Sequence, residues 1–300
     1  MTTDALPSEP ILLNAGPSDF GWSPHGAFLH CPSEYAFKYM RKGTSSGGDT
    51  RVVGGGSEAQ ARGRAVHLVL AHHYRRLQAE QMGDDPNKWL DPYAAAEAGA
   101  RAGEYSMDHV SMACKMLDYY RAWWGEEKHT IIAVEEVWKA ELGTLDAPGH
   151  PKHGEPIYYA PRVDLVTRDA SGGVWFWDHK TTSVMKGDSV SGYSVHGQFI
   201  GMKHLGRAFF GGDFKGVILN FIQTTPPPKF ARPPLEAAPH ADAQWPRSIL
   251  RVRHEMAKLE AETLAGRLRP DEWPKSLTET SCVGRYGKCS AFDWCSWGGS

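Results

Sequence analysis

Apolar residues recur three or four positions apart along most of the first half of the chain, a spacing typical of amphipathic helices. The pattern is longest over residues 58–81, and it predicts two further helices near residues 92–102 and 104–125. Closer to the N-terminus, a helical pattern over residues 23–40 contains Pro32, so we expect the helix to begin at this proline. The first half is therefore expected to be helical.

The second half changes to short runs rich in β-branched and aromatic residues, which are typical of strands. The clearest is the stretch 157–183, which we interpret as two strands joined by a glycine-containing turn. The other elements are expected in this order: a strand at 130–142, a helix at 190–210, a buried strand at 216–224, a proline-rich loop at 225–246 and a last helix at 245–268. This order predicts an α+β fold, with a mixed central β-sheet flanked by helices and a helical N-terminal portion.

The charge balance of 33 basic and 35 acidic residues excludes a uniformly basic nucleic-acid coat protein but leaves room for a local basic cleft. The first thirty residues contain acids and prolines where a signal peptide needs a basic end and an apolar run. No window approaches the run of about eighteen apolar residues that spans a membrane. We therefore expect a cytoplasmic protein, with an irregular lead-in at residues 1–22 and a mobile, glycine- and serine-rich segment at residues 43–57.

The stretch 157–183 has an acid in its first strand and an Asp-x-Lys sequence in its second. Because side chains alternate along a strand, Asp178 and Lys180 project to the same side. If the two strands pair antiparallel, Asp164 comes close to Asp178. Two carboxylates with a lysine beside them suit a hard divalent cation and a phosphate group.

An ordinary ion-pair cluster on a solvated sheet face is the alternative interpretation. Against it, the face that carries Asp178 is otherwise apolar, and buried charges are costly without a partner or a metal. In a functional site, Asp164 and Asp178 would hold Mg²⁺ or Mn²⁺, with the backbone carbonyl of His179 as a further oxygen ligand. Lys180 would hold the attacking water or neutralise charge that develops on a phosphodiester.

Further motifs occur in order around this pair of strands. They are Gly63-x-x-x-His67 on the long helix, Asp164 in a strand, Asp178-x-Lys180, and Gln198 on the following helix. With this order and spacing, the chain resembles the RecB-like exonuclease branch of the PD-(D/E)xK nucleases. The resemblance implies a restriction-endonuclease-like core, a metal-binding role for the helix histidine, and a place near the DNA for the glutamine.

One position departs from the pattern of that family. Four residues after Gln198 the family has a tyrosine, and this chain has Met202. Tyr193 is a candidate to replace the missing side chain. Two acids of the first strand, Glu135 and Glu136, could approach the metal, but we interpret them as solvent-facing or structural.

Basic residues on the long helix are candidates for contacts with the DNA backbone. Arg62 and Arg64 lie close to His67 in the sequence and, with Tyr193 and Gln198, make up the predicted DNA-binding set. The alternative for such basic residues is an ordinary solvated helix face.

Five cysteines are an odd number, which argues against a disulfide framework. Four of them suit Zn²⁺ or an iron–sulfur cluster, namely Cys31 and, in the tail at residues 280–297, Cys282, Cys289 and Cys295. Their layout resembles the iron–sulfur subset of the RecB-like nucleases, which includes AddB-type helicase–nucleases and a CRISPR-adaptation nuclease. The resemblance implies a [4Fe–4S] cluster that clamps the C-terminal tail to the first helix, with Zn²⁺ or four free thiols as alternatives. Cys114 is expected to be a small buried hydrophobe.

We predict one PD-(D/E)xK nuclease domain over residues 23–300, with a helical insertion at about 83–128. The favoured function is a metal-dependent DNA nuclease, an exonuclease acting on single strands or DNA ends in replication, recombination or repair. The alternative is a non-catalytic DNA-binding or scaffolding module that keeps the nuclease fold and the metal cluster. No Gly-x-x-x-x-Gly-Lys-Ser/Thr phosphate loop is present, so the nuclease would act alone or with a helicase, recombination or replication partner.

Overall fold

The computed structural model describes residues 21–40, 58–185, 190–235, 238–276, 278–284, 287–289 and 291–297. The chain forms two compact units. Of the described residues, those within 58–138 and 162–239 make up unit 1, and those within 21–40, 139–161 and 240–297 make up unit 2. The predicted lead-in, up to residue 20, and the predicted segment at 43–57 lie outside the described residues.

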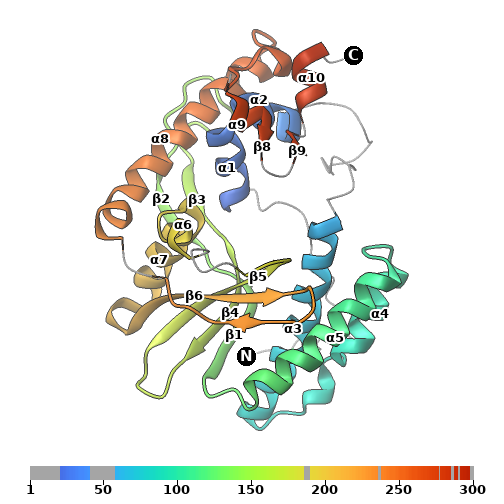
Figure 1. Cartoon of the computed structure of the whole chain (residues 1–300). Helices are drawn as coiled ribbons and strands as arrows, with labels where there is room; N and C mark the ends of the chain where they lie inside the picture. The colour runs from blue at the N-terminus through green and yellow to red at the C-terminus, as the bar shows by residue number, and fades with distance from the viewer. Residues whose placement is uncertain are drawn as a thin grey trace. The chain divides into compact units, whose positions relative to one another are not determined.

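A five-stranded sheet forms the core of unit 1, with the strand order β1-β4-β5-β6-β7 (Figure 1). The strands are β1 (Thr130–Val137), β4 (Arg162–Arg168), β5 (Val174–Thr182), β6 (Phe214–Gln223) and β7 (Phe230–Ala231). β4 and β5 pair antiparallel, as predicted for the stretch 157–183, whereas β5 and β6 pair parallel. The predicted α+β fold with a mixed central sheet is confirmed.

Helices cover both faces of this sheet. They are α3 (Glu58–Met82), α4 (Pro92–Arg101), α5 (Met107–Trp124), α6 (Ser191–Ser194) and α7 (Gly197–Phe210), with short 3₁₀ turns at Pro86–Lys88 and Gly211–Asp213. Leu165 and Trp177 belong to the apolar cluster that also contains residues of α3 and α5. Phe176, which directly precedes Trp177 in β5, lies instead against Phe210 of α7, with ring centroids 6.0 Å apart. Alternation along β5 therefore separates the two helical layers.

Two local features bring helices close to β5. Gly63 lets α3 approach the strand, because a Cβ at this position would lie 3.2 Å from Oγ1 of Thr181. At the start of α7, the ring of His196 accepts a hydrogen bond from the backbone N–H of Gln198. This cap places Gln198 in the first turn of α7.

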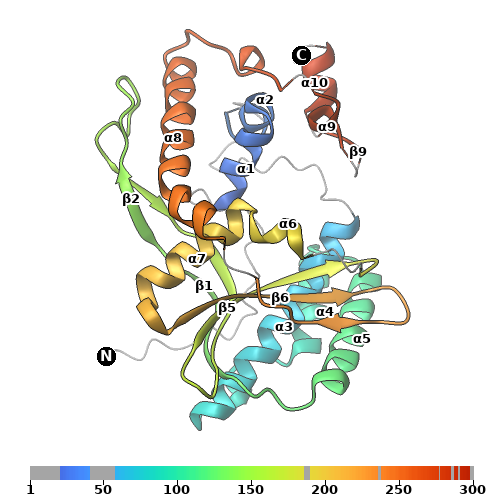
Figure 2. The ribbon, with the colours of Figure 1, turned by 60° about the vertical axis from the view of Figure 1, so that its left-hand side comes forward.

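Unit 2 combines helices with two small antiparallel sheets (Figure 2). Its elements are α1 (Trp22–His30), α2 (Pro32–Tyr35), a π-helical turn (Ala36–Met40), β2 (Ala140–Thr144), β3 (Pro156–Tyr159), α8 (Pro239–Leu264), a 3₁₀ turn (Pro270–Glu272), α9 (Glu279–Cys282), β8 (Val283–Gly284), β9 (Gly287–Lys288) and α10 (Phe292–Trp297). In one of its apolar clusters, which also contains Met256 of α8, the ring of Tyr35 stacks on Trp273 and meets Phe28 edge-on. The buried carboxylate of Glu260 ties this unit together, since it accepts hydrogen bonds from Tyr35, His150 and Arg253.

Two predicted element boundaries are wrong, the start of the first helix and the end of the first strand. The helix at Pro32 exists, but a separate helix, α1, precedes it because Cys31 adopts an extended backbone with φ −163°. The predicted strand at 130–142 ends at Val137, and the residues that follow form β2, which pairs with β3 in a different sheet. The residues 156–159 therefore belong to unit 2 and not to the pair of strands that carries the acids.

The predicted proline-rich loop at 225–246 is too long, because α8 already begins at Pro239 and ends at Leu264. A proline fits the first turn of a helix, where its missing N–H has no partner to lose. A second proline, Pro246, lies inside the helix. None of the described helices combines the length and the apolar character needed to cross a bilayer.

The packing of α7 predicts that Gly206→Ala destabilises the protein. A Cβ at Gly206 would lie 2.1 Å from the ring of Phe214, so the ring would have to move. Overpacking costs about 1–3 kcal/mol, which exceeds the gain of roughly 1 kcal/mol that alanine brings to a helix. Urea unfolding measures this difference. Gly192→Ala is the matched control, since nothing lies within 4 Å of its Cβ; equal stability of the two variants would contradict the packing described.

Candidate active site

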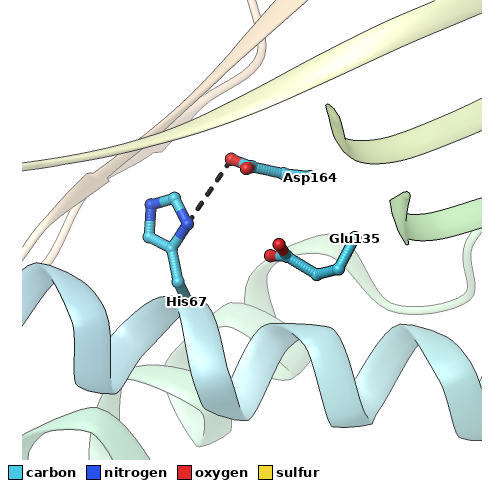
Figure 3. A group of neighbouring side chains, drawn as sticks. All are labelled: His67, Glu135 and Asp164. Carbon is cyan, nitrogen blue, oxygen red and sulfur yellow. Dashed lines mark ion pairs between the residues drawn. The ribbon is translucent and has the colours of Figure 1, made fainter. Parts of the chain in front are cut away.

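Three side chains from separate elements of unit 1 converge beside β5 (Figure 3). His67 of α3, Glu135 of β1 and Asp164 of β4 offer ligand atoms that all lie within 4.8 Å of one another. Nδ1 of His67 lies 3.5 Å from Oδ2 of Asp164. An imidazole with two carboxylates is a donor set that binds divalent metal ions.

Glu135 reaches this group because β1 and β4 are paired so that Val134 faces Leu165 and Glu136 faces Val163. This register puts Glu135 opposite Asp164. The backbone of Glu135 has φ 53°, a left-handed conformation that is uncommon for a residue other than glycine. Its side chain is only 5% exposed, which rules out the solvent-facing alternative for Glu135 and not the structural one, whereas Glu136 is exposed.

Asp178 belongs to a second cluster. Its Oδ2 lies 2.7 Å from Nζ of Lys180, and its Oδ1 accepts a hydrogen bond of 2.8 Å from Nε2 of Gln198. The register of β4 and β5, with Leu165 opposite Trp177, continues to place Asp164 opposite Asp178. Two carboxylates thus sit side by side on neighbouring strands, one in each cluster.

The backbone of His179 lies between the two clusters. Its N–H donates to Oδ2 of Asp164 at 2.7 Å, and its carbonyl oxygen lies 2.8 Å from Nε2 of His67. If Nε2 donates to that carbonyl, Nδ1 presents a lone pair towards a carboxylate, an arrangement that a cation would stabilise. The side chain of His179 is buried, with its ring stacked against Tyr74.

Burial and mutual repulsion set the electrostatics of these acids. Burial, followed by the carboxylate of Asp164, raises the pKa of Glu135 well above its ordinary value. Burial and the carboxylate of Asp178 raise the pKa of Asp164, although His67 acts in the opposite direction. Burial alone would lower the pKa of Lys180, but Asp178 and Asp164 outweigh it and raise that pKa, so the lysine stays charged.

A further observation supports a divalent cation at His67, Glu135 and Asp164. Oε1 of Glu135 is buried and has no hydrogen-bond partner among the described residues. The nearest cation to its other oxygen is Arg162, whose Nε is 3.8 Å from Oε2. A buried carboxylate oxygen without a partner is costly, and a metal ion would supply the missing interaction.

The remaining predicted residues lie around these clusters. Met202 is buried in α7 and does not reach the acids with a polar group. The ring of Tyr193 packs against Phe199, with centroids 5.4 Å apart, and Tyr193 contributes to the electrostatic environment of Lys180. Arg62 and Arg64 are half-buried near the start of α3, on the turns before His67.

In unit 2, the four predicted cysteine ligands lie near one another. Burial raises the pKa of Cys295, and the thiols of Cys31, Cys289 and Cys282 add to this effect. They form no disulfide. Figure 1 shows α9 and α10, which carry two of these cysteines, next to α2.

Backbone N–H groups point at two of these sulfurs. Ser276 donates to Sγ of Cys31 and Ala291 donates to Sγ of Cys289, both at 3.4 Å. Such bonds stabilise thiolates, and metal centres held by cysteine commonly have them. The donor set therefore fits a metal centre with thiolate ligands.

A pair of acids on neighbouring strands, an Asp-x-Lys strand and a helix histidine thus lie together in unit 1. The PD-(D/E)XK nuclease superfamily matches residues 23–295, and the chain belongs to this superfamily. The predicted superfamily is thereby confirmed, while the iron–sulfur subset stays a prediction.

No curated protein matches the chain. Among solved structures, the one described as the crystal structure of SSO0001 covers 66% of this chain and 83% of that chain, with 14% sequence identity and a TM-score of 0.31. Membership of the superfamily implies a nuclease, that is, a hydrolase of phosphodiester bonds.

Sequence reasoning named Glu135 as able to approach the metal but did not choose it as a member of the site. The pairing of residues 130–137 with residues 162–168, which brings Glu135 opposite Asp164, is visible in the structure alone. The left-handed backbone of Glu135 carried no signal in the sequence.

The electrostatics of Glu135 predict a pH-dependent gain in stability for Glu135→Gln. A folded-state pKa above the unfolded one means that the ionised carboxylate destabilises the metal-free fold as the pH rises through that range. With a chelator at about pH 8, Glu135→Gln should be more stable than the wild type by about 1–3 kcal/mol. The gain should shrink as the pH falls towards ~3, below the pKa of the unfolded state, where the carboxyl is protonated in both states.

Urea titrations at the two pH values measure this difference. The exposed neighbour supplies the matched control, since Glu136→Gln should change stability by no more than about 0.5 kcal/mol. If Glu135→Gln is no more stable than the wild type at the higher pH in the presence of the chelator, burial and Asp164 do not destabilise the ionised carboxylate of Glu135.

Proposed function

We propose that the protein is a Mg²⁺- or Mn²⁺-dependent deoxyribonuclease that acts as an exonuclease on single strands or DNA ends. The observation that carries the proposal is the pair of adjacent clusters on β4 and β5. One is a half-buried set of possible metal-ligand atoms at His67, Glu135 and Asp164, and the other is the Asp178–Lys180 ion pair. The proposed setting is DNA replication, recombination or repair, alone or with a helicase or recombination partner.

The proposed metal ligands are His67, Asp164, Asp178 and the carbonyl of His179, with Glu135 as a further carboxylate. The spacing supports this set, because Nδ1 of His67 and Oδ2 of Asp164 are 3.5 Å apart. Adjacent ligands of an octahedral ion with bonds of about 2.1 Å lie about 3 Å apart. When bound, the ion would supply an activated water and charge relief on the phosphate.

The chain itself would position the reacting groups. Lys180 is held by Asp178 and would orient the attacking water or neutralise charge that develops on the phosphate. Gln198 fixes the other oxygen of Asp178 through its amide. Three further side chains are proposed to contact the DNA. Arg62 and Arg64 would bind phosphates. Tyr193 would take the role of the tyrosine that the family has at the position of Met202.

For unit 2 we propose a [4Fe–4S] cluster on Cys31, Cys282, Cys289 and Cys295, with Zn²⁺ as the alternative. The proximity of the thiols of Cys31, Cys282, Cys289 and Cys295, and the N–H groups that point at two of them, support such a centre, which would tie Cys31 to the tail.

Nuclease activity is tested with the full chain, purified anaerobically and incubated with end-labelled linear single- and double-stranded DNA. We expect cleavage with Mn²⁺ or Mg²⁺ and none with a chelator. Asp178→Asn and Lys180→Met should each lower the rate by about 10²–10³-fold or more, because each removes a group aimed at the reacting phosphate. A covalently closed single-stranded circle should resist an exonuclease.

Asp213→Asn is the matched control, since this aspartate is exposed at the end of its 3₁₀ turn, and it should keep full activity. If the wild type and Asp178→Asn degrade DNA equally, the proposed site is wrong. DNA binding without cleavage in any tested metal ion would indicate a non-catalytic binding module instead.

The cluster makes a separate prediction about colour and metal content. An anaerobic preparation should contain iron and acid-labile sulfide, with the visible absorbance of an iron–sulfur cluster, and Cys289→Ser should lose both. Cys114→Ser should keep them, since Cys114 packs on α5 in the apolar cluster of unit 1. A colourless preparation with stoichiometric zinc would replace the iron–sulfur proposal with the zinc alternative.

A further inference from the structure

A chain of buried polar side chains in unit 1 runs up to the ring of His179. Its members are all at most 2% exposed except at the far end, and they are His179 of β5, Asn220 of β6, Tyr120 of α5, Tyr74 of α3, and Arg232 after β7. We call this set the His179 network. Polar groups at such depth are costly unless hydrogen bonds hold them, so their arrangement calls for a role.

The contact nearest to the site is between His179 and Asn220. The two residues are direct partners in the parallel register of β5 and β6, so their side chains lie next to each other. Nδ2 of Asn220 is 3.0 Å from Nδ1 of His179 and also 3.0 Å from the hydroxyl of Tyr120. An amide nitrogen only donates, so Nδ1 of His179 accepts. This hydrogen bond fixes the orientation of the His179 ring.

The rest of the network holds Asn220 and the ring in place. The hydroxyls of Tyr120 and Tyr74 are 2.7 Å apart, and Nη2 of Arg232 donates to both, at 2.7 and 3.1 Å. Nη1 of Arg232 pairs with Glu127 at 3.0 Å. The guanidinium also lies over the ring of Trp124, 4.1 Å from its centroid, which fixes it from a second direction.

The His179 network reaches the candidate metal site through His179 itself. The ring of Tyr74 stacks on that of His179 at 5.9 Å and an angle of 19°. Helix α3 therefore contacts His179 twice, since His67, two turns earlier, faces its carbonyl oxygen. With the ring fixed by Tyr74 and Asn220, the N–H and the carbonyl of His179 keep their directions towards Asp164 and His67.

We propose that Asn220 and Tyr120 are positioning residues for the divalent cation, because they orient the backbone of His179 through its buried ring. The inference rests on the proposed function, in that it takes the carbonyl of His179 as a metal ligand. Partners that orient a ligand from behind typically change metal affinity by about 10–100-fold when they are removed.

The test is Mn²⁺ affinity of the folded, full-length protein without DNA, from the electron paramagnetic resonance signal of free Mn²⁺. We expect Asn220→Leu to bind Mn²⁺ about 10–100-fold more weakly than the wild type, and Tyr120→Phe to be weakened in the same direction by less. In cleavage assays, both variants should need more Mn²⁺ for half-maximal rate yet return to the wild-type rate at saturating Mn²⁺.

Tyr105→Phe is the matched control, since it removes another buried tyrosine hydroxyl of the same apolar cluster outside the His179 network, and it should bind Mn²⁺ like the wild type. Circular dichroism establishes that each variant is folded, and Tyr120→Phe decides the question if Asn220→Leu does not fold. Unchanged Mn²⁺ affinity in the folded network variants would overturn the inference and leave the proposed function standing. No Mn²⁺ binding by the wild type, or equal binding by Asp164→Asn, would overturn the metal site itself.

Discussion

The fold of unit 1 removes several carboxylates from water at one place, and the rest of the site depends on how their repulsion is offset. Asp178 has a direct cationic partner in Lys180. Asp164 has a weaker set, with an N–H at 2.7 Å and a histidine at 3.5 Å. Among the described residues, Glu135 has weaker cationic partners, namely Arg162 with its Nε at 3.8 Å and the charge of Arg75. The compensation is thus graded across the sheet and is weakest at Glu135, in the group to which His67 adds the lone pair of its Nδ1.

Strand β5 organises this gradient through its alternation. Asp178 and Lys180 point to one face, and the ring of His179 points to the other, where α3 and α5 pack. The backbone of His179 runs between the two faces and makes hydrogen bonds with both a carboxylate and an imidazole. Three consecutive residues, Asp178, His179 and Lys180, therefore connect the His179 network on one side of β5 with the candidate site on the other side.

Local patterns explain why much of this arrangement was predictable from the sequence. The helical period of α3 and the two-residue period of β4 and β5 are properties of short segments, and they correctly paired the strands that carry Asp164 and Asp178. Glu135 was not predictable, because its place depends on a register shift between Ile131 and Ala133 and on its own left-handed backbone. Asn220 read as one residue of an apolar run, and only the parallel register with β5 gives it a partner.

The parallel pairing of β5 with β6 has a consequence for the order of folding. The β4–β5 hairpin closes over a short turn, whereas β6 can join β5 only after the chain has passed through α6 and α7. Contacts between distant parts of a chain form slowly, because closing a long loop costs entropy before the contacts compensate for it. The acids of the hairpin should therefore meet early in refolding, while the contact of Asn220 with His179 forms late. In a stopped-flow experiment, the capacity to bind Mn²⁺ tightly would then appear after the hairpin itself.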